Sequence, residues 1–338
     1  MVYLLLLLSF VILIKGADVF IEGAAKVAKI FKIPELIIGI IIVGFGTSAP
    51  ELAVNIAAVM KGSNDMAVGN IVGSNVFNIL FIVGAIALYR PMTIDDKLAT
   101  FDFPISVLAA ILLPFFALGG RFLTFNSGFT RLDGIVLLLI FAYYCKETIT
   151  RSLEDQKLKE KKMLIYEIGQ GTFSLTKHLE GSQDEKPCAK ALIKDIILII
   201  VGLVCVIKGG DMVVEYASKI AVDFGMSKHL VGLTIVGIGT SLPELVVSII
   251  AARKGQQDIV LGNVVGSNTF NILFTLGLTM LLKPIAVTES MVVDTVTVAL
   301  VTTAVGMIAL ANKKIGKKMA VALIVVYIIY MANVIISA

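Results

Sequence analysis

The sequence predicts an all-α membrane protein with ten transmembrane helices, arranged as two five-helix repeats of inverted topology with broken helices in the core. Three features support this fold class: an apolar composition, a polar segment that divides the chain, and a long internal repeat. Of the 338 residues, 57% are hydrophobic and only 16% are charged, whereas soluble domains carry about 25% charged residues. The mean hydropathy is +0.94, and the apolar residues fall in long runs, which indicates a bilayer environment.

Apolar runs long enough to cross a bilayer, about 20 residues each, occur ten times. The first starts without a basic leader region, so we interpret it as a retained span and not as a signal peptide. The long polar segment 149–193 is predicted to link a first half, 1–148, to a second half, 194–338. The ten predicted spans are 2–24, 36–60, 66–88, 101–119, 132–148, 194–217, 229–252, 259–281, 289–311 and 318–336.

The distribution of Lys and Arg predicts the orientation in the membrane. With the N-terminus outside, the cytoplasmic loops hold 21 of the 29 Lys and Arg residues and the outside loops hold 6. Both termini are then predicted outside and the linker 149–193 in the cytoplasm. The basic residues lie in short loops and the net charge is only +4, which gives no indication of a nucleic-acid surface. No cofactor and no obligatory protein partner is indicated.

The two halves contain the same motif. Residues 39–84 match residues 232–277 without a gap, with 28 of 46 positions identical. Because each half holds five spans, an odd number, the second half is expected to enter the membrane from the opposite side, as in the inverted repeats of secondary transporters. The most similar stretches are Gly-x-Gly-Thr-Ser-x-Pro-Glu, at 44–51 and 237–244, and Gly-Asn-x-x-Gly-Ser-Asn-x-Phe-Asn, at 69–78 and 262–271.

The proline in the first stretch predicts a helix break in the middle of spans 36–60 and 229–252. Proline lacks an N–H and clashes with the preceding turn, and the neighbouring glycines let the chain open. Carbonyl groups freed in this way are tolerated at membrane depth only where they line a buried or watery cavity. Directly after each break stands a carboxylate, Glu51 or Glu244, which must be paired or liganded within the membrane.

The side chains around the two predicted breaks offer oxygen ligands. An all-oxygen site suits hard cations such as Ca²⁺ and Na⁺ and not Zn²⁺ or copper. Two carboxylates neutralise one Ca²⁺ ion or are balanced by two or more Na⁺ ions, which is the physical basis of obligatory exchange. The candidate ligands are the carboxylates of Glu51 and Glu244, the hydroxyls of Thr47, Ser48, Ser74, Thr240, Ser241 and Ser267, and the amides of Asn78 and Asn271.

Other polar residues of the motifs have a structural interpretation. The asparagines at 70, 75, 263 and 268 are interpreted as hydrogen-bonded bridges between helices, and the glycines of the second stretch as positions where helices pack closely.

The duplicated motif resembles the α-repeats of the sodium/calcium exchanger family, within the cation/Ca²⁺ exchanger superfamily. The resemblance covers both halves and is most specific at 39–84 and 232–277. It implies a ten-helix fold whose first and sixth helices are long, tilted and slide over a packed core, and it implies Ca²⁺ transport against Na⁺ by alternating access. The compact form resembles prokaryotic members of the family, which implies a plasma (inner) membrane protein.

The resemblance also implies a set of ligands. Glu51 and Glu244 would be the central Ca²⁺ ligands, joined by the carbonyls of Thr47 and Thr240. Two flanking Na⁺ sites would use Ser48 and Ser267 on one side and Ser241 and Ser74 on the other. The carbonyls of Gly44 and Gly237 would complete these sites, where other members often carry Ala.

Two departures from the family pattern bear on function. Some members carry an acid at the position of Asn271, which goes with K⁺ co-transport; here Asn78 and Asn271 are both amides, which implies K⁺ independence. The linker is also too short to hold the Ca²⁺-sensing domains of animal members.

Three alternatives to Na⁺-coupled exchange remain at this point. The first is H⁺-coupled Ca²⁺ exchange, in which Glu51 and Glu244 take protons instead; the hydroxyl-rich flanks favour Na⁺. The second is a cation channel, against which the inverted halves argue. The third is an enzyme, which is disfavoured because Gly-x-Gly-Thr-Ser is not a nucleophile elbow and has no general base beside it.

Overall fold

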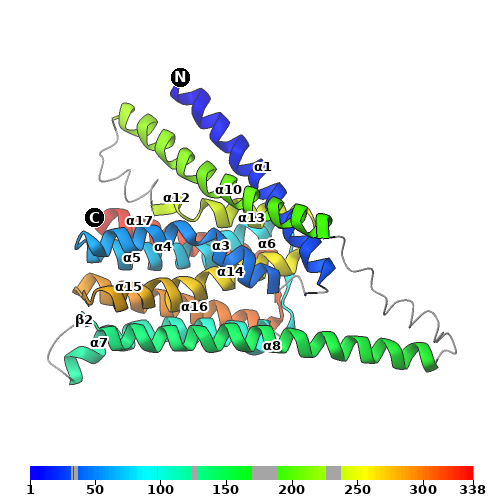
Figure 1. Cartoon of the computed structure of the whole chain (residues 1–338). Coiled ribbons are helices and arrows are strands. Elements are labelled where there is room, and N and C mark those ends of the chain that lie inside the picture. Colours follow the sequence, from blue (N-terminus) through cyan, green and yellow to red (C-terminus); the bar gives the residue numbers. More distant parts are fainter. Residues whose placement is uncertain are drawn as a thin grey trace.

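The computed structural model describes residues 1–31, 33, 37–96, 98–123, 128–169, 189–225 and 237–337. The described chain is mostly helical, with four very short strands. The crossed pair of helices α1 and α10 lies on one side of the bundle and the long helix α8 runs along the opposite side (Figure 1).

Most of the described helices and strands of one half have a counterpart, in the same order, in the other half. In the first half they are α1 (Val2–Ile30), η1 (Ile38–Gly44), α3 (Phe45–Thr47), α4 (Ala49–Met60), α5 (Asn64–Val76), η2 (Phe77–Ile82), α6 (Val83–Tyr89), β1 (Met92–Thr93), η3 (Leu98–Asp102), α7 (Phe103–Leu123), β2 (Gly128–Phe129) and α8 (Arg131–Gly169). In the second half they are α10 (Ala189–Asp223), α12 (Gly237–Gly239), α13 (Leu242–Arg253), α14 (Gln257–Thr269), η5 (Phe270–Leu276), α15 (Gly277–Leu282), β3 (Ile285–Ala286), α16 (Glu289–Asn312), β4 (Lys314–Ile315) and α17 (Lys317–Ser337). The segments labelled η are π-helical.

Among the described residues, seven helices are long and apolar enough to cross a membrane, and the bent pair η1–α3 and α4 makes an eighth candidate. These eight coincide with eight of the ten predicted spans. The predicted span 132–148 lies inside α8, where Asp133, Lys146 and Glu147 shorten the apolar stretch. The predicted span 229–252 begins in residues 226–236, which lie outside the described residues.

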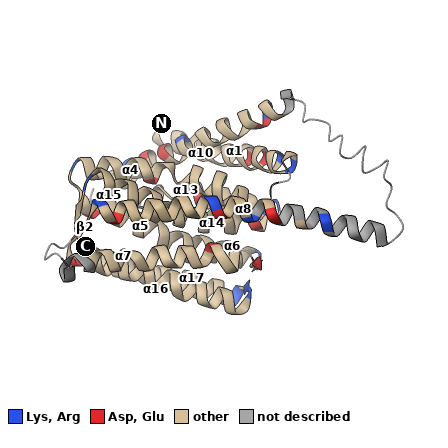
Figure 2. Cartoon of the chain, turned by 60° about the horizontal axis from the view of Figure 1, so that its bottom comes forward, with Lys and Arg blue, Asp and Glu red and all other residues tan. Residues whose placement is uncertain are grey.

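The predicted polar linker is helical over much of its length. Helix α8 continues without a break to Gly169, and α10 begins at Ala189. The segment 153–163 is rich in Leu, Lys and Glu, which are strong helix formers, so the helix continues where the apolar stretch has ended. Figure 2 shows that most of the ribbon of the helix bundle belongs to uncharged residues, with Lys, Arg, Asp and Glu in short coloured stretches.

The two short sheets each join one strand from either half. Strand β1 pairs antiparallel with β4, and β2 pairs antiparallel with β3. The helix contacts also join the two halves: α7 packs on α16, α8 on α15, and α6 on α17. Both halves therefore contribute to one hydrophobic core.

Helices α1 and α10 approach closely because glycines stand at their crossing. A Cβ atom at Gly202 would lie only 2.5 Å from the backbone nitrogen of Phe20, and one at Gly209 would lie 2.7 Å from that of Leu13. Phe20 and Leu13 are fully buried, so the backbones of α1 and α10 pack tightly at these two glycines.

We expect Gly202→Ala to lower the thermal midpoint of the purified protein, because the added methyl group forces the two backbones apart at a cost of about 1–3 kcal/mol. Gly316→Ala is the matched control, since no atom lies within 4 Å of the Cβ position there. Thermal unfolding of both variants in the same detergent measures the difference. Equal midpoints for Gly202→Ala and the wild type would contradict the close packing of α1 on α10.

Candidate ion-binding site

Both motif helices break at a serine. Ser48 separates α3 from α4, with φ −84° and ψ 8°, and Ser241 precedes α13 with φ −90° and ψ 6°. The segment 38–47 meets α4 at an angle of 42°. Pro50 and Pro243 stand in the first turns of α4 and α13, where the missing N–H has no partner within the helix. The predicted breaks are confirmed.

The breaks place two carboxylates at helix beginnings inside the protein. Glu51 stands in the first turn of α4 and Glu244 in the first turn of α13. The side chains of both residues are completely buried. The positive end of a helix dipole stabilises a carboxylate by about 0.3–1 kcal/mol at exposed sites and more where it is partly buried, which offsets only part of the cost of burying a charge.

The two halves exchange hydrogen bonds at these carboxylates. The Ser48 hydroxyl donates to Glu244 Oε1 at 2.9 Å, and the Ser241 hydroxyl lies 3.3 Å from Glu51 Oε1. The spacing Ser-x-x-Glu is that of a capping box, yet neither serine caps its own helix. Each serine instead reaches the glutamate of the other half, so the two helix beginnings face one another across a shared site.

The second motif adds a further hydroxyl to each side of the site. The Ser74 hydroxyl lies 3.4 Å from Glu51 Oε1, the same oxygen that faces Ser241. The Ser267 hydroxyl donates to the Gly44 carbonyl at 3.0 Å. The predicted groups Ser241–Ser74 and Ser267–Gly44 are therefore each brought together by the fold.

One oxygen of each glutamate accepts no hydrogen bond from the described residues. These atoms are Oε2 of Glu51 and Oε2 of Glu244, and both are buried. The described side chains that bond to the two carboxylates are neutral hydroxyls. A buried carboxylate without a positive partner is strongly unfavourable, so the arrangement calls for a bound cation or proton.

Asn70 and Asn263 tie each glutamate to the threonine of the other half. The Asn263 amide donates to the Glu244 carbonyl at 3.2 Å, and its oxygen lies 3.2 Å from the Thr47 hydroxyl. The Asn70 amide lies 3.5 Å from the Glu51 carbonyl, and its oxygen lies 3.4 Å from the Thr240 hydroxyl. The predicted bridging role of these asparagines is confirmed.

The two threonine hydroxyls therefore lie beside an asparagine of the other half, and each also interacts with a carboxylate, Thr240 with Glu51 and Thr47 with Glu244. The Thr47 hydroxyl also lies 3.0 Å from the Val43 carbonyl of its own helix. Gly237, the remaining predicted residue, begins α12 in the second half.

Asn78 and Asn271 lie in the π-helical segments η2 and η5 and are completely buried. Each amide nitrogen donates to the side chain of an asparagine in the other half: Asn78 to Asn268 at 3.0 Å and Asn271 to Asn75 at 3.2 Å. The oxygens of Asn78 and Asn271 accept no hydrogen bond from the part of the chain that the structure describes. These two oxygens are available as neutral ligands.

Sequence reasoning missed the partners that fix Asn70 and Asn263. Asn70 donates to the Asn55 side chain at 2.8 Å, and Asn263 donates to the Ser248 hydroxyl at 2.8 Å. Asn55 and Ser248 occupy matching positions of the repeat but differ in residue type. In both halves a hydrogen-bond acceptor stands one helical turn after the glutamate. This shared pattern could have predicted the partners of Asn70 and Asn263 from the sequence.

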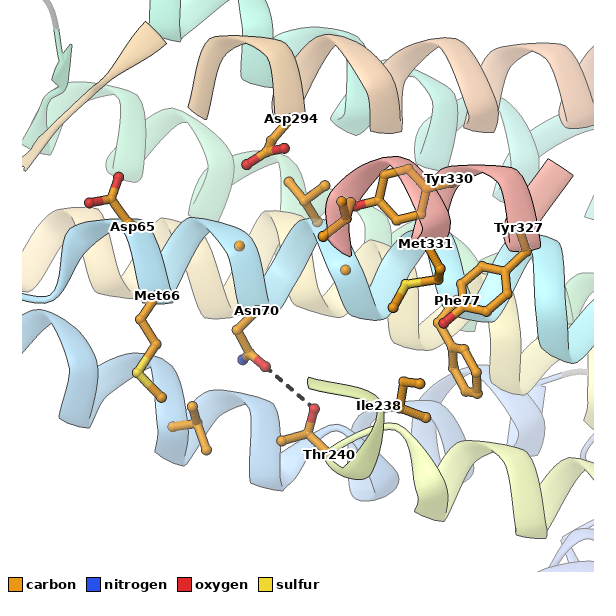
Figure 3. A pocket seen from close by; sticks show the side chains of 15 residues that line it. Asp65, Met66, Asn70, Phe77, Ile238, Thr240, Asp294, Tyr327, Tyr330 and Met331 are labelled. Atoms are coloured by element: carbon orange, nitrogen blue, oxygen red, sulfur yellow. Dashed lines mark hydrogen bonds between the residues drawn. The ribbon is translucent and has the colours of Figure 1, made fainter. Parts of the chain in front are cut away.

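A pocket of about 350 Å³ lies beside this site, against α4, α5, α16 and α17. Figure 3 shows the hydrogen bond between Asn70 and Thr240 at one wall, with Asp65 and Asp294 on the opposite side.

In the first half, η1 packs directly on α14, where the Cβ position of Gly266 lies 2.6 Å from the Ile40 carbonyl. The matching residues of the second half, 231–237, lie mostly outside the described residues.

Comparison with known proteins shows the family of the chain. A family model described as "Sodium/calcium exchanger protein" matches residues 1–146 and 194–336. The chain is 37% identical over 278 residues to the putative antiporter CaxA of Alkalimonas amylolytica, covering 82% of this chain and 80% of that one. It is 32% identical over 307 residues to the sodium/calcium exchanger MaX1 of Methanosarcina acetivorans, covering 85% of both chains.

Solved structures give the same answer. The structure of the sodium-calcium exchanger NCX_Mj matches with a TM-score of 0.80 at 26% sequence identity, covering 98% of this chain and 99% of that one. The apolar helices and these relatives together indicate an integral multi-pass membrane protein of the cation/Ca²⁺ antiporter type. Since the family model matches nearly the whole of both halves, the chain belongs to the sodium/calcium exchanger protein family.

Proposed function

We propose that the protein exchanges Ca²⁺ for Na⁺ across the membrane by alternating access, without a requirement for K⁺. The observation that carries the proposal is the pair of buried carboxylates, Glu51 and Glu244, which come from opposite halves and whose side-chain hydrogen-bond partners among the described residues are neutral. Their unpartnered oxygens supply two negative charges to one enclosed region.

Charge balance explains why such a site exchanges ions. With both carboxylates ionised, the site holds two negative charges that burial makes unfavourable. One Ca²⁺ ion neutralises both charges, and so do two Na⁺ ions. A conformational change that switches access to the site from one side of the membrane to the other is therefore favourable only with ions bound, which couples the two fluxes.

The proposed ligands come from the repeated motifs of both halves. Glu51 and Glu244 hold Ca²⁺ centrally with the carbonyls of Thr47 and Thr240, and Asn78 and Asn271 add neutral oxygens. The flanking Na⁺ sites comprise Ser48, Ser267 and the Gly44 carbonyl on one side, and Ser241, Ser74 and the Gly237 carbonyl on the other. The hydrogen bonds between Ser267 and Gly44, and between Ser241 and Glu51, support this grouping.

We further propose a fold of ten membrane helices in two inverted halves, 1–148 and 194–338, joined by the linker 149–193. The reciprocal pairing of strands and helices between the halves supports a two-fold relation. The distribution of Lys and Arg supports outside termini and a cytoplasmic linker. Helices α1 and α10, which contact each other along glycines, are the element proposed to slide over the core, in the plasma membrane of a prokaryotic cell.

Replacing either carboxylate by its amide removes one of the two charges without changing side-chain size. We expect Glu51→Gln and Glu244→Gln each to reduce Na⁺-driven ⁴⁵Ca²⁺ uptake into proteoliposomes by about 100-fold or more, because ligand charge sets Ca²⁺ affinity. Glu147→Gln, on α8 and paired with Arg151, is the matched control. Uptake that persists in either site variant rejects the central role of these residues.

Coupling to Na⁺ is tested by comparing driving forces. We expect an imposed Na⁺ gradient to drive ⁴⁵Ca²⁺ uptake and a pH gradient without Na⁺ to drive none. Ser48→Ala should raise the Na⁺ concentration for half-maximal exchange, because it removes a proposed Na⁺ ligand. Thr297→Val removes a hydroxyl that bonds only to its own helix and should leave that concentration unchanged. Uptake driven by the pH gradient alone would identify an H⁺-coupled exchanger.

The amide at Asn271 is the proposed reason for K⁺ independence. We expect Asn271→Asp to make exchange sensitive to K⁺, because a third carboxylate adds a negative charge that a further monovalent cation can balance. The measurement is Na⁺-driven ⁴⁵Ca²⁺ flux with and without K⁺ in wild type and variant. A flux that is unaffected by K⁺ in both proteins would count against this assignment.

A further inference from the structure

Two asparagines that are not proposed to touch ions surround those that are. The side-chain oxygen of Asn268 accepts from the Asn78 amide at 3.0 Å, and that of Asn75 accepts from the Asn271 amide at 3.2 Å. All four side chains are at most 1% exposed. An asparagine side-chain amide can flip, which interchanges the positions of its oxygen and nitrogen. The surrounding hydrogen bonds must therefore determine which of the two atoms faces the ion site.

Backbone carbonyls fix the orientation of the outer pair. The Asn75 amide nitrogen donates to the Asn268 carbonyl at 3.3 Å, and the Asn268 amide nitrogen donates to the Asn75 carbonyl at 3.2 Å. A carbonyl oxygen only accepts hydrogen bonds, so each of these side chains must turn its nitrogen to the backbone. Its own oxygen is then left to accept from the next asparagine.

The same logic continues to the inner pair. Because Asn75 offers only its oxygen to Asn271, the Asn271 amide must present its nitrogen there and leave its oxygen free. Asn268 acts on Asn78 in the same way. The two free oxygens are buried and accept no hydrogen bond from the described residues, which is the state expected of atoms that face a cation.

We propose that Asn75 and Asn268 are positioning residues that hold Asn271 and Asn78 with their oxygens toward the transported ions. The proposal rests on the function proposed above and adds residues that no ligand assignment includes. Its physical basis is a series of hydrogen bonds that starts at a backbone carbonyl. Because a carbonyl only accepts, the donor and the acceptor of each following bond are fixed. A turned amide would place N–H groups beside a cation, which they repel, so the chain of hydrogen bonds favours ion binding.

The arrangement is crossed between the halves. Asn75 belongs to α5 of the first half but orients Asn271 of the second half, and Asn268 of α14 orients Asn78 of η2. If Asn75 and Asn268 only bridged α5 and α14, replacing Asn75 would have the same effect in an Asn78 variant as in an Asn271 variant. Coupling within the crossed pairs is therefore the property to measure.

The test measures ⁴⁵Ca²⁺ binding to the purified full-length protein in lipid nanodiscs, together with exchange kinetics in proteoliposomes. We expect Asn75→Ala and Asn268→Ala each to weaken Ca²⁺ binding by about 10- to 100-fold, the usual effect of removing a partner that orients a metal ligand. The Ca²⁺ concentration for half-maximal flux should rise while the maximal flux stays within about two-fold. Thr279→Val is the matched control, because among the described residues its buried hydroxyl bonds to the Thr275 carbonyl of the same helical segment.

Double variants test the crossed coupling, since residues that act on one ligand give non-additive effects. In an Asn271→Ala background, adding Asn75→Ala should weaken Ca²⁺ binding no further. In an Asn78→Ala background, Asn75→Ala should keep its full effect. The opposite pattern, or equal effects in both backgrounds, would overturn the proposal. Failure of both single variants to yield monodisperse protein would do so too, because it would make the pair a structural clamp.

The outcome separates this proposal from the one on which it rests. If Glu51→Gln and Asn271→Ala both leave Ca²⁺ binding unchanged, the proposed ion site itself is wrong. If these two variants lose binding while Asn75→Ala and Asn268→Ala retain it, the ion site stands and only the positioning role is rejected.

Discussion

The constraint on which the structure depends is the burial of two carboxylates in a protein that crosses a bilayer. Glu51 and Glu244 are completely buried, and hydroxyl groups are their side-chain hydrogen-bond partners. Helix beginnings and hydroxyls offset only part of the cost of two buried charges. The remainder must come from mobile cations or protons, and we propose that the interaction that destabilises the unliganded site also makes it bind and exchange them.

The two halves form one site because polar groups of each half form hydrogen bonds with polar groups of the other. Ser48 reaches Glu244, Ser241 reaches Glu51, and the paired asparagines of α5 and α14 bond to one another's backbone. Neither half alone satisfies its own polar groups, and unsatisfied groups are costly at membrane depth. This reciprocity explains why a duplicated sequence folds into a single core.

Much of this arrangement could be predicted from the sequence. The duplicated Gly-x-Gly-Thr-Ser-x-Pro-Glu motif predicted both helix breaks, since proline cannot continue a hydrogen-bonded helix, and the buried oxygens followed from residue type. The sequence could not predict that each serine bonds to the glutamate of the other half, because Ser-x-x-Glu is also the pattern of a local helix cap. The directions of the asparagine amides depend on contacts between segments about 190 residues apart. The continuation of α8 to Gly169 follows from helix propensity, which hydropathy does not measure.

The most direct measurement is a crystal structure of the protein soaked with Ca²⁺ or Sr²⁺, with the ion located by its anomalous scattering. The account predicts one divalent ion bound to oxygens of both Glu51 and Glu244, at about 2.3–2.6 Å for Ca²⁺, and displaced when Na⁺ is raised. An ion bound to only one of these residues, or located elsewhere in the protein, would contradict it.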